Sequence, residues 1–265
     1  PAVGPDRFKF TTNEVKSPGH DSRSSTENAR RIPLDFQIAV LAGDGIGPEV
    51  TAQGANVLET VGRVFGHNFR LEYGDVGGIS IDNHGTPLLP EVSDLAASVD
   101  AVLFGAVGGP KWDDPSASVR PEDGLLELRT RLGVFANIRP VKVYPWLLDA
   151  SSLKPSVIEG VDLVVVRELT GGLYYAQPKG RHETDQGWTA VDTMRYSEGE
   201  LERILRVGFE LAQGRRHKLT SVDKANVLEC SRLWRQTANR LAPEYPDVEL
   251  EHALVDSCTM HLIQR

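Results

Sequence analysis

The sequence predicts an α/β fold in which a mostly parallel sheet carries helices on its faces. From residue 36 onward, short apolar runs typical of buried strands alternate with longer segments of helical periodicity. Glycine and proline residues punctuate the joins between these segments. Alternating strands and helices indicate parallel pairing, because parallel strands need a long crossover connection. The 265 residues are enough for two modest domains.

The expected elements of the N-terminal half begin with an apolar strand at residues 37–41. Pro48 then stands where the first residue of a helix is favoured, and apolar residues at helical spacing follow it. Further strands and helices are expected in alternation at residues 69–73, 89–97, 100–104 and 124–132.

The C-terminal half begins with an extended segment at residues 135–143. Residues 161–166 are almost all apolar and β-branched, which is typical of a strand covered on both faces. Residues 174–194 lack a helical apolar stripe and predict a protruding β-arm or long loop. Ser197 and Glu200 form a capping box that opens a helix. This helix should run to residue 213, and further elements should follow at residues 218–222, 231–241 and 249–255.

Composition and charge exclude several classes of function. A net charge of −8 argues against a nucleic-acid partner, which would need a basic face. No run approaches the roughly 18 apolar residues of a membrane span. Two cysteines, Cys230 and Cys258, cannot form a disulfide framework and fit a reducing compartment such as the cytoplasm. Residues 1–35 are rich in serine, proline and charge and predict a disordered extension.

The glycine cluster at residues 43–49 lies between an expected strand and an expected helix. The third glycine of a dinucleotide fingerprint would fall at position 48, which is proline, so that fingerprint is absent. No lysine followed by serine or threonine completes a phosphate-binding P-loop either. By itself the cluster predicts a tight strand-to-helix turn.

Residues 43–49 nevertheless closely resemble the opening of the β-decarboxylating dehydrogenases, the isopropylmalate and isocitrate dehydrogenase family. Further segments are similar to the isopropylmalate branch of that family, at residues 73–84, 104–112, 135–141, 167–174 and 221–228. The resemblance covers residues 36–265. It implies an isopropylmalate-dehydrogenase-like two-domain fold with a protruding β-arm, distinct from the Rossmann fold.

The resemblance also implies how the domains are organised. The first, cofactor-side domain would occupy residues 36–134. The second domain, for substrate binding and dimerisation, would occupy residues 135–265 and include the arm at about 174–194. The family continues past the position of Arg265 with two further metal-binding aspartates and a loop for the adenosine end of NAD. We therefore expect a C-terminally incomplete fold and little activity from the isolated chain.

Three arginines on different elements are candidates for binding a dicarboxylate, because guanidinium groups bind carboxylates through two parallel hydrogen bonds. Taken singly, each would most simply form a surface salt bridge. The resemblance implies that Arg129, Arg139 and Arg167 hold the substrate carboxylates. Leu125, one helical turn before Arg129, offers an apolar surface that favours isopropylmalate. A third carboxylate, as in isocitrate, would be left unpaired there.

The resemblance implies an acid–base pair, with Lys224 as base for the oxidation and Tyr174 as proton donor after decarboxylation. Asn226, two residues beyond Lys224 on an expected extended segment, should share its face and orient substrate or nicotinamide. Asp256, between a strand and a helix, would by itself be an N-cap. The family position is a ligand of Mg²⁺ or Mn²⁺ and contacts the substrate.

The resemblance further implies a loop against the nicotinamide half of NAD, formed by Gly109, Pro110, Lys111 and Trp112. It implies a homodimer with shared active sites. The expected activity is NAD-dependent oxidative decarboxylation of 3-isopropylmalate to 2-oxo-4-methylpentanoate in leucine biosynthesis. Alternatives are a related enzyme acting on homoisocitrate, tartrate or isocitrate, and a non-catalytic truncated chain of the same fold.

Overall fold

The computed structural model describes residues 33–264, which divide into two compact units at Phe135 and Ala136. Most of the predicted disordered extension, residues 1–32, lies outside the described residues, and the first strand already begins at Asp35. The domain roles assigned from the sequence stay a prediction.

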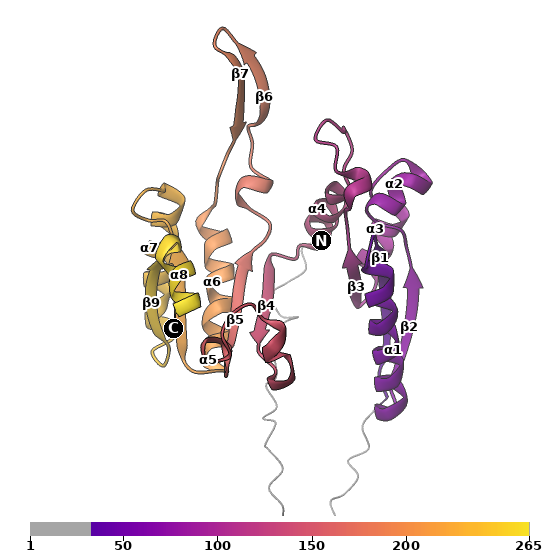
Figure 1. The fold of residues 1–265 in the computed structure, drawn as a ribbon, viewed down its shortest axis with the longest axis horizontal. Coiled ribbons are helices and arrows are strands. Elements are labelled where there is room, and N and C mark those ends of the chain that lie inside the picture. The colour runs from indigo at the N-terminus through magenta and orange to yellow at the C-terminus, as the bar shows by residue number, and fades with distance from the viewer. Residues whose placement is uncertain (1–32, 265) are drawn as a thin grey trace, which may run out of the picture. The chain divides into compact units, whose positions relative to one another are not determined.

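The unit formed by residues 33–135 is built on a three-stranded parallel sheet in the order β2-β1-β3 (Figure 1). The central strand β1 (Asp35–Gly43) pairs with β2 (Asn68–Tyr73) and β3 (Ala101–Ala106). Its apolar residues 38–41 are all buried, as expected for a central strand. The three strands predicted for this unit and their parallel pairing are therefore confirmed.

Three long helices of this unit, α1 (Gly47–Phe65), α3 (Pro90–Ser98) and α4 (Pro121–Leu132), are also confirmed. The sequence did not predict α2 (Gly78–His84), because seven residues are too few for a periodic apolar pattern to emerge. A one-turn 3₁₀ helix follows β3 (Pro110–Trp112). The core of the unit contains Leu41, Val76, Leu88, Val92, Ala96 and Leu128.

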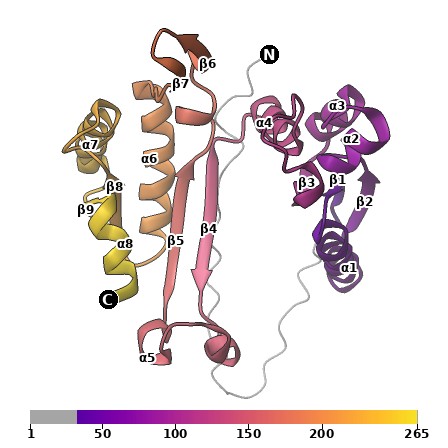
Figure 2. The ribbon, with the colours of Figure 1, turned by 45° about the horizontal axis from the view of Figure 1, so that its top comes forward.

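The unit formed by residues 136–264 starts with an antiparallel pair, β4 (Ala136–Lys142) and β5 (Asp162–Glu168). Between these strands lie a short 3₁₀ segment (Pro145–Ala150) and the one-turn helix α5 (Pro155–Ile158). The prediction that the β-branched run is covered on both faces is wrong, because Val165 remains 44% exposed. An antiparallel pair can leave one face open, and α6 (Glu198–Gln213) lies along the pair beside β5 (Figure 2).

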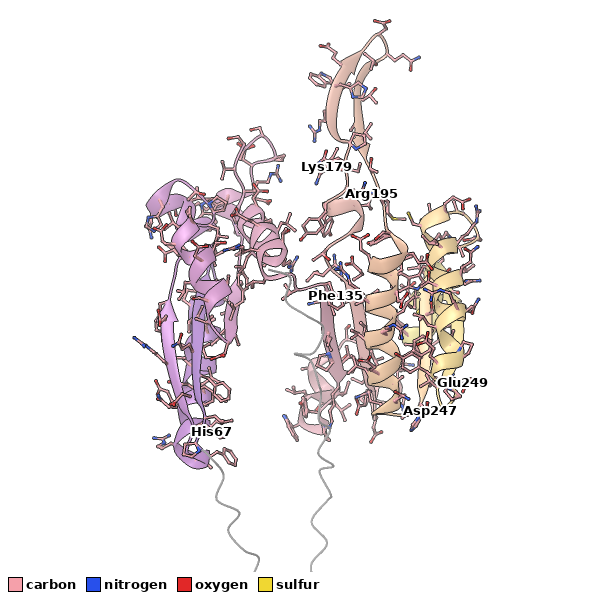
Figure 3. All side chains as sticks on the ribbon, turned by 180° about the vertical axis from the view of Figure 1, so that it is seen from behind. His67, Phe135, Lys179, Arg195, Asp247 and Glu249 are labelled. Carbon is pink, nitrogen blue, oxygen red and sulfur yellow. The ribbon has the colours of Figure 1, made fainter. Side chains whose placement is uncertain are left out.

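The predicted arm is a β-hairpin of β6 (Lys179–Thr184) and β7 (Gly187–Asp192), preceded by a 3₁₀ turn (Gly172–Tyr174). Every residue of both strands is exposed. Figure 3 shows side chains projecting from both faces of this hairpin, above the labelled Lys179 and Arg195. The hairpin therefore has no core of its own within its unit.

The rest of this unit combines a parallel strand pair with two helices. Strands β8 (Lys218–Asp223) and β9 (Glu249–Leu254) are joined through α7 (Glu229–Leu241) and a 3₁₀ turn (Ala242–Glu244), and α8 (Val255–Gln264) follows β9. The core between α6 and α7 contains Leu201, Leu205, Phe209, Ala238 and Leu241.

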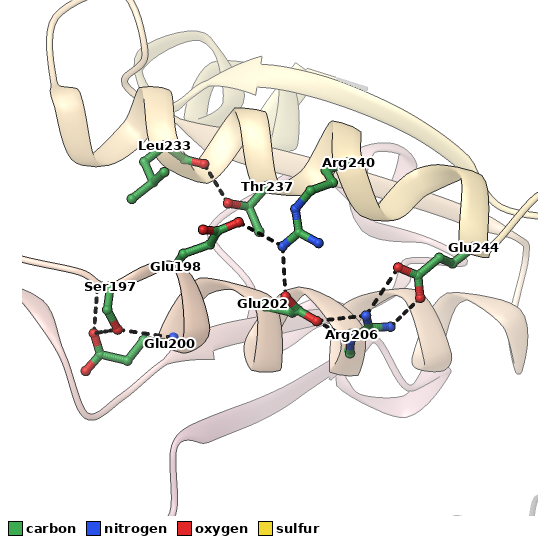
Figure 4. Close-up of polar contacts among 9 residues, drawn as sticks. All are labelled: Ser197, Glu198, Glu200, Glu202, Arg206, Leu233, Thr237, Arg240 and Glu244. Atoms are coloured by element: carbon green, nitrogen blue, oxygen red, sulfur yellow. Dashed lines mark hydrogen bonds and ion pairs between the residues drawn. The ribbon is translucent and has the colours of Figure 1, made fainter.

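The predicted capping box of α6 is confirmed: Ser197 N–H donates to the Glu200 carboxylate at 2.7 Å, and Glu200 N–H donates to Ser197 Oγ at 3.4 Å. On the polar side of α6, Glu202 accepts hydrogen bonds from Arg206 and from Arg240 of α7 (Figure 4). No helix among residues 33–264 is both long and apolar enough to cross a membrane.

Candidate active site

The turn between β1 and α1 is held by the carboxylate of Asp44, which is only 3% exposed. Its oxygens accept the N–H groups of Gly78 and Ile79, each at 2.7 Å, and of Gly108 at 2.8 Å. The Asp44 N–H donates to the Ala106 carbonyl at 2.6 Å. One carboxylate thus joins the turn to the start of α2 and to the loop after β3.

The glycines on either side of Asp44 make this turn possible. Gly43 and Gly45 have φ angles of 68° and 56°, in the left-handed region that favours glycine. A Cβ atom on Gly43 would lie 1.9 Å from the Ala106 carbonyl oxygen. The tight strand-to-helix turn predicted from the glycine cluster is therefore confirmed.

The loop after β3, which the sequence predicts as a cofactor loop, is anchored by Asp82 of α2. The Asp82 carboxylate accepts hydrogen bonds from Lys111 Nζ at 2.5 Å and from Trp112 Nε1 at 3.3 Å. The Lys111 hydrogen bond is the main cause that holds the pKa of Asp82 below its usual value. The Trp112 ring also packs directly on Gly78. Gly109 and Pro110 directly precede Lys111 in this loop, and Pro110 is exposed.

Leu125 and Arg129 both lie on α4, one helical turn apart and half-buried. Within the described part of the chain, the Arg129 side chain has no acidic partner. Its neighbour Arg131, by contrast, pairs with Asp94 at 2.9 Å. Arg129 therefore does not form the ordinary surface ion pair that a single arginine suggests.

Arg139 and Arg167 lie on the same face of the β4–β5 pair. Asn137 stands directly opposite Arg167, and Arg139 is two residues further along the same strand. The Arg139 Nε donates to the Asn137 side-chain oxygen at 2.5 Å. The Arg167 guanidinium lies over the ring of Tyr174, 5.6 Å from its centre. Among residues 33–264, neither arginine contacts a carboxylate.

Tyr174 is carried by the turn after β5, and a buried carboxylate shapes that turn. Glu168 accepts the N–H groups of Thr170 at 3.0 Å and Gly171 at 2.9 Å. Tyr196 packs against this glycine turn, and burial, followed by the charge of Glu168, raises the pKa of Tyr196. Tyr174 itself is 54% exposed.

Lys224 and Asp256 form an ion pair. Lys224 directly follows β8 and Asp256 lies just after β9, so both stand at the carboxyl ends of neighbouring parallel strands. Side chains at that edge of a parallel pair are brought together by the fold itself. The structure thus unites the predicted base with the predicted metal ligand.

Two local predictions in this region are wrong. Asn226 is not on an extended segment: the N–H groups of Val227 and Leu228 both donate to the Lys224 carbonyl, at 3.0 and 2.9 Å, and fold the segment into a turn. Its shared face with Lys224 therefore cannot be argued from strand alternation. Asp256 is not an N-cap either, because α8 begins at Val255 and Asp256 lies in its first turn.

The donor set for a divalent metal is small in this part of the chain. In the described range, no group of three or more histidine, cysteine, aspartate or glutamate residues could hold a metal ion. Asp256, with its side chain 62% exposed, can supply one oxygen ligand. A hard cation takes several oxygens, so Asp256 would supply one ligand of a larger set.

The predicted residues fall into two groups within residues 136–264. One contains Arg139, Arg167 and Tyr174, and the other contains Lys224 and Asp256. No hydrogen bond or ion pair among the described residues joins one group to the other. Arg129 and residues 109–112 belong to the other unit. Arginines without acidic partners beside an exposed tyrosine suit a small carboxylate ligand.

Four carboxylates that organise these groups were not predicted: Asp44, Asp82, Glu168 and Asp223. Asp223 directly precedes Lys224, and Glu168 directly follows Arg167, so each is adjacent to a predicted residue. An acidic residue at the end of an apolar strand, next to glycines or a lysine, is the signal that could have found Asp44, Glu168 and Asp223, whereas Asp82 lies within α2.

Comparison with known proteins identifies the class. The isocitrate/isopropylmalate dehydrogenase family matches residues 37–265. This chain therefore belongs to that family, as its motifs indicated.

Curated relatives of the chain carry the name 3-isopropylmalate dehydrogenase. The chain is 56% identical over 230 residues to the 3-isopropylmalate dehydrogenase of Anaeromyxobacter dehalogenans, covering 87% of this chain and 65% of the relative. It is 55% identical over 230 residues to the enzyme of the same name from Geobacillus kaustophilus, covering 87% and 62%. The chain thus spans just under two thirds of the length of these relatives.

A solved structure shares the fold. An isocitrate dehydrogenase from Methylococcus capsulatus superposes with a TM-score of 0.73 at 28% identity, covering 87% of this chain and 63% of that one. The predicted fold class, an α/β fold of the isopropylmalate dehydrogenase type with parallel strands and a β-arm, is therefore confirmed.

Proposed function

We propose that this chain is part of an enzyme that carries out the NAD-dependent oxidative decarboxylation of 3-isopropylmalate to 2-oxo-4-methylpentanoate, a step of leucine biosynthesis. The observation that carries this proposal is the Lys224–Asp256 pair at the ends of β8 and β9. It lies in a chain more than half identical to curated 3-isopropylmalate dehydrogenases.

The substrate is a dicarboxylate, and three arginines are proposed to bind it. Arg129, Arg139 and Arg167 have no acidic partner within residues 33–264, so their guanidinium groups do not have to break an ion pair before binding a ligand. Charge-assisted hydrogen bonds to carboxylates are the strong class of such bonds. Leu125, one turn from Arg129, would meet the isopropyl group.

Acid–base chemistry is assigned to Lys224 and Tyr174. Lys224 Nζ takes the proton of the substrate hydroxyl while the hydride leaves the carbon that bears this hydroxyl. After CO₂ has departed, the Tyr174 hydroxyl donates a proton to the carbon that carried the lost carboxylate. Asn226, exposed in the turn after Lys224, orients substrate or nicotinamide.

Two cofactors complete the proposal, NAD and either Mg²⁺ or Mn²⁺. When bound, NAD accepts the hydride and the cation acts as a Lewis acid toward the substrate oxygens. Asp256 would hold the cation. The segment of Gly109, Pro110, Lys111 and Trp112, fixed to α2 through Asp82, would lie against the nicotinamide. We assign this cofactor role to residues 36–134, which also contribute Leu125 and Arg129 to the substrate, and the rest of substrate binding to residues 135–265.

A homodimer is part of the proposal. The hairpin β6–β7 exposes Trp188 at 73%. Helix α8 has no buried residue and exposes Met260, Leu262 and Ile263 at 55–57%. Apolar side chains gathered on exposed elements mark contacts with partners. Both cysteines are free, which fits the cytoplasm as the proposed location.

The proposal is tested by following NADH formation with 3-isopropylmalate, isocitrate, homoisocitrate and tartrate in the presence of Mg²⁺. We expect the highest kcat/KM for 3-isopropylmalate, and a loss of turnover of about 10²-fold or more in Lys224→Met. A higher kcat/KM for another acid would transfer the assignment to that substrate. Turnover of none of them by a protein extended past Arg265 to the length of the curated relatives would favour the non-catalytic alternative.

A further inference from the structure

A buried carboxylate is hydrogen-bonded to the turn that carries Lys224. Asp223, the last residue of β8, is 6% exposed, and its Oδ1 accepts the N–H of Ala225 at 2.9 Å. That N–H belongs to the peptide unit directly after Lys224. The carboxylate therefore fixes the backbone on both sides of the proposed base, through its own Cα and through the Ala225 amide.

Arg235 of α7 holds this carboxylate in place with a fork of two hydrogen bonds. Its Nε donates to Asp223 Oδ2 at 2.8 Å and its Nη2 donates to Oδ1 at 2.9 Å. Two parallel bonds fix the orientation of a carboxylate as well as its position. Since α7 lies in the connection between β8 and β9, the fork anchors the Lys224 turn to the helix that joins the two strands.

We propose that Asp223 and Arg235 are positioning residues for Lys224, acting through the Ala225 amide. The proposal rests on the proposed function, in which Lys224 is the base. Neither residue touches the substrate. Their contribution is to keep the Lys224 amine beside Asp256, with which it pairs at the ends of the strands.

A purely structural role can be separated from positioning by two substitutions at one site. Asp223→Asn keeps an oxygen that can accept the Ala225 N–H but loses the charge opposite Arg235. Asp223→Ala removes the charge and the acceptor together. If Asp223 served only as half of a buried ion pair, both variants would lose activity to the same extent. If it positions Lys224 through the amide, the asparagine variant should keep much more of the activity.

The experiment measures kcat, KM, thermal midpoint and deuterium exchange of the Ala225 amide in both variants and in Arg235→Lys, using the whole chain. We expect a fall in kcat of about 10- to 100-fold in Asp223→Ala, with KM for 3-isopropylmalate within about threefold of wild type. We expect fast exchange of the Ala225 amide in that variant and slow exchange in Asp223→Asn.

Asp162→Ala is the control, because it removes another aspartate–arginine ion pair of the same unit, one whose carboxylate side chain is 47% exposed where that of Asp223 is 1% exposed. It should change the thermal midpoint without lowering kcat. Equal kcat in the alanine and asparagine variants, or unchanged kcat despite fast Ala225 exchange, would overturn the positioning role. If Asp223→Ala does not fold, Arg235→Lys with wild-type kcat and wild-type Ala225 exchange would overturn it.

Failure of the proposed function would show differently. The wild-type protein would then turn over no hydroxy acid, whereas Ala225 exchange and the rate at which an amine reagent labels Lys224 would still respond to Asp223→Ala. Wild-type exchange and labelling in that variant would contradict the positioning role without any activity measurement.

Discussion

Single buried carboxylates shape the turns that carry the proposed site. Asp44, Glu168 and Asp223 are each at most 9% exposed, and each accepts at least one backbone N–H. A buried carboxylate without such partners would be costly, so these bonds and the turns that present them stabilise one another. At this scale the proposed site stands on turns whose backbone N–H groups are bound by carboxylates.

Leu125 provides a prediction at the residue scale. We expect Leu125→Ser to lower kcat/KM for 3-isopropylmalate by about 10- to 100-fold, because the apolar contact of a branched alkyl group is lost. The kcat/KM for isocitrate should fall much less. Val134→Ser, at an exposed apolar position just after α4, serves as control and should change neither value. Equal losses for both substrates would place the isopropyl group elsewhere.

The sequence placed Asp256 correctly at the join between a strand and a helix, because strands with clear apolar patterns are recognisable locally. It could not show that the side chains of Lys224 and Asp256 pair, since pairing depends on β8 and β9 being neighbours. The two hydrogen bonds from Arg235 to Asp223 could not be predicted either, because they depend on how α7 packs beside β8. The extended prediction for Asn226 failed because hydrogen bonds to the Lys224 carbonyl bend that segment.

Secondary-structure elements were predicted best where apolar periodicity is long. The helices α1, α6 and α7 and the strands β1, β8 and β9 fall close to their expected ranges. Helix α2 was missed because its start is fixed by Asp44, which lies 34 residues before Gly78 and is bound only in the folded state. The predicted mostly parallel pairing holds for β2-β1-β3 and β8-β9, whereas β4-β5 is antiparallel.

His252 of β9 provides a prediction at the element scale, since it faces α7, with Nε2 2.8 Å from Asn239 Oδ1. Burial, and then the charge of Arg235, lowers the pKa of His252 below its usual 6.5, against an opposing effect of Asp223. The His252 imidazole therefore binds a proton more tightly in the unfolded chain than in the folded protein. Its contribution to the free energy of unfolding is fully present above about pH 6.5 and is lost as the pH falls below that value.

The measurement is the thermal midpoint at pH 5 and pH 7 in the wild type and in His252→Gln. We expect the thermal midpoint to fall further between pH 7 and pH 5 in the wild type than in the variant. Ion-paired carboxylates such as Asp162 and Glu202 have pKa values below their usual range, so their contributions are lost only below about pH 4. Equal losses in both proteins would contradict the role of His252.

At the scale of the whole molecule, the residues proposed for catalysis and substrate binding form separate groups. Within residues 136–264, Arg167 and Tyr174 form one contact, and Lys224 and Asp256 form another. The proposed homodimer resolves this separation, because a two-fold axis would let Tyr174 of one subunit serve the Lys224 and Asp256 of its partner. The exposed hairpin β6–β7 and helix α8 are the elements proposed to join the subunits.

Subunit complementation tests this account most directly. Tyr174→Phe and Lys224→Met proteins are assayed separately for 3-isopropylmalate-dependent NADH formation, and then together after subunit exchange. Each alone should be nearly inactive. In the mixture, half of the dimers combine the two variants and contain one intact site, so the account predicts about a quarter of wild-type activity. A mixture that forms mixed dimers but remains as inactive as its components would contradict the account.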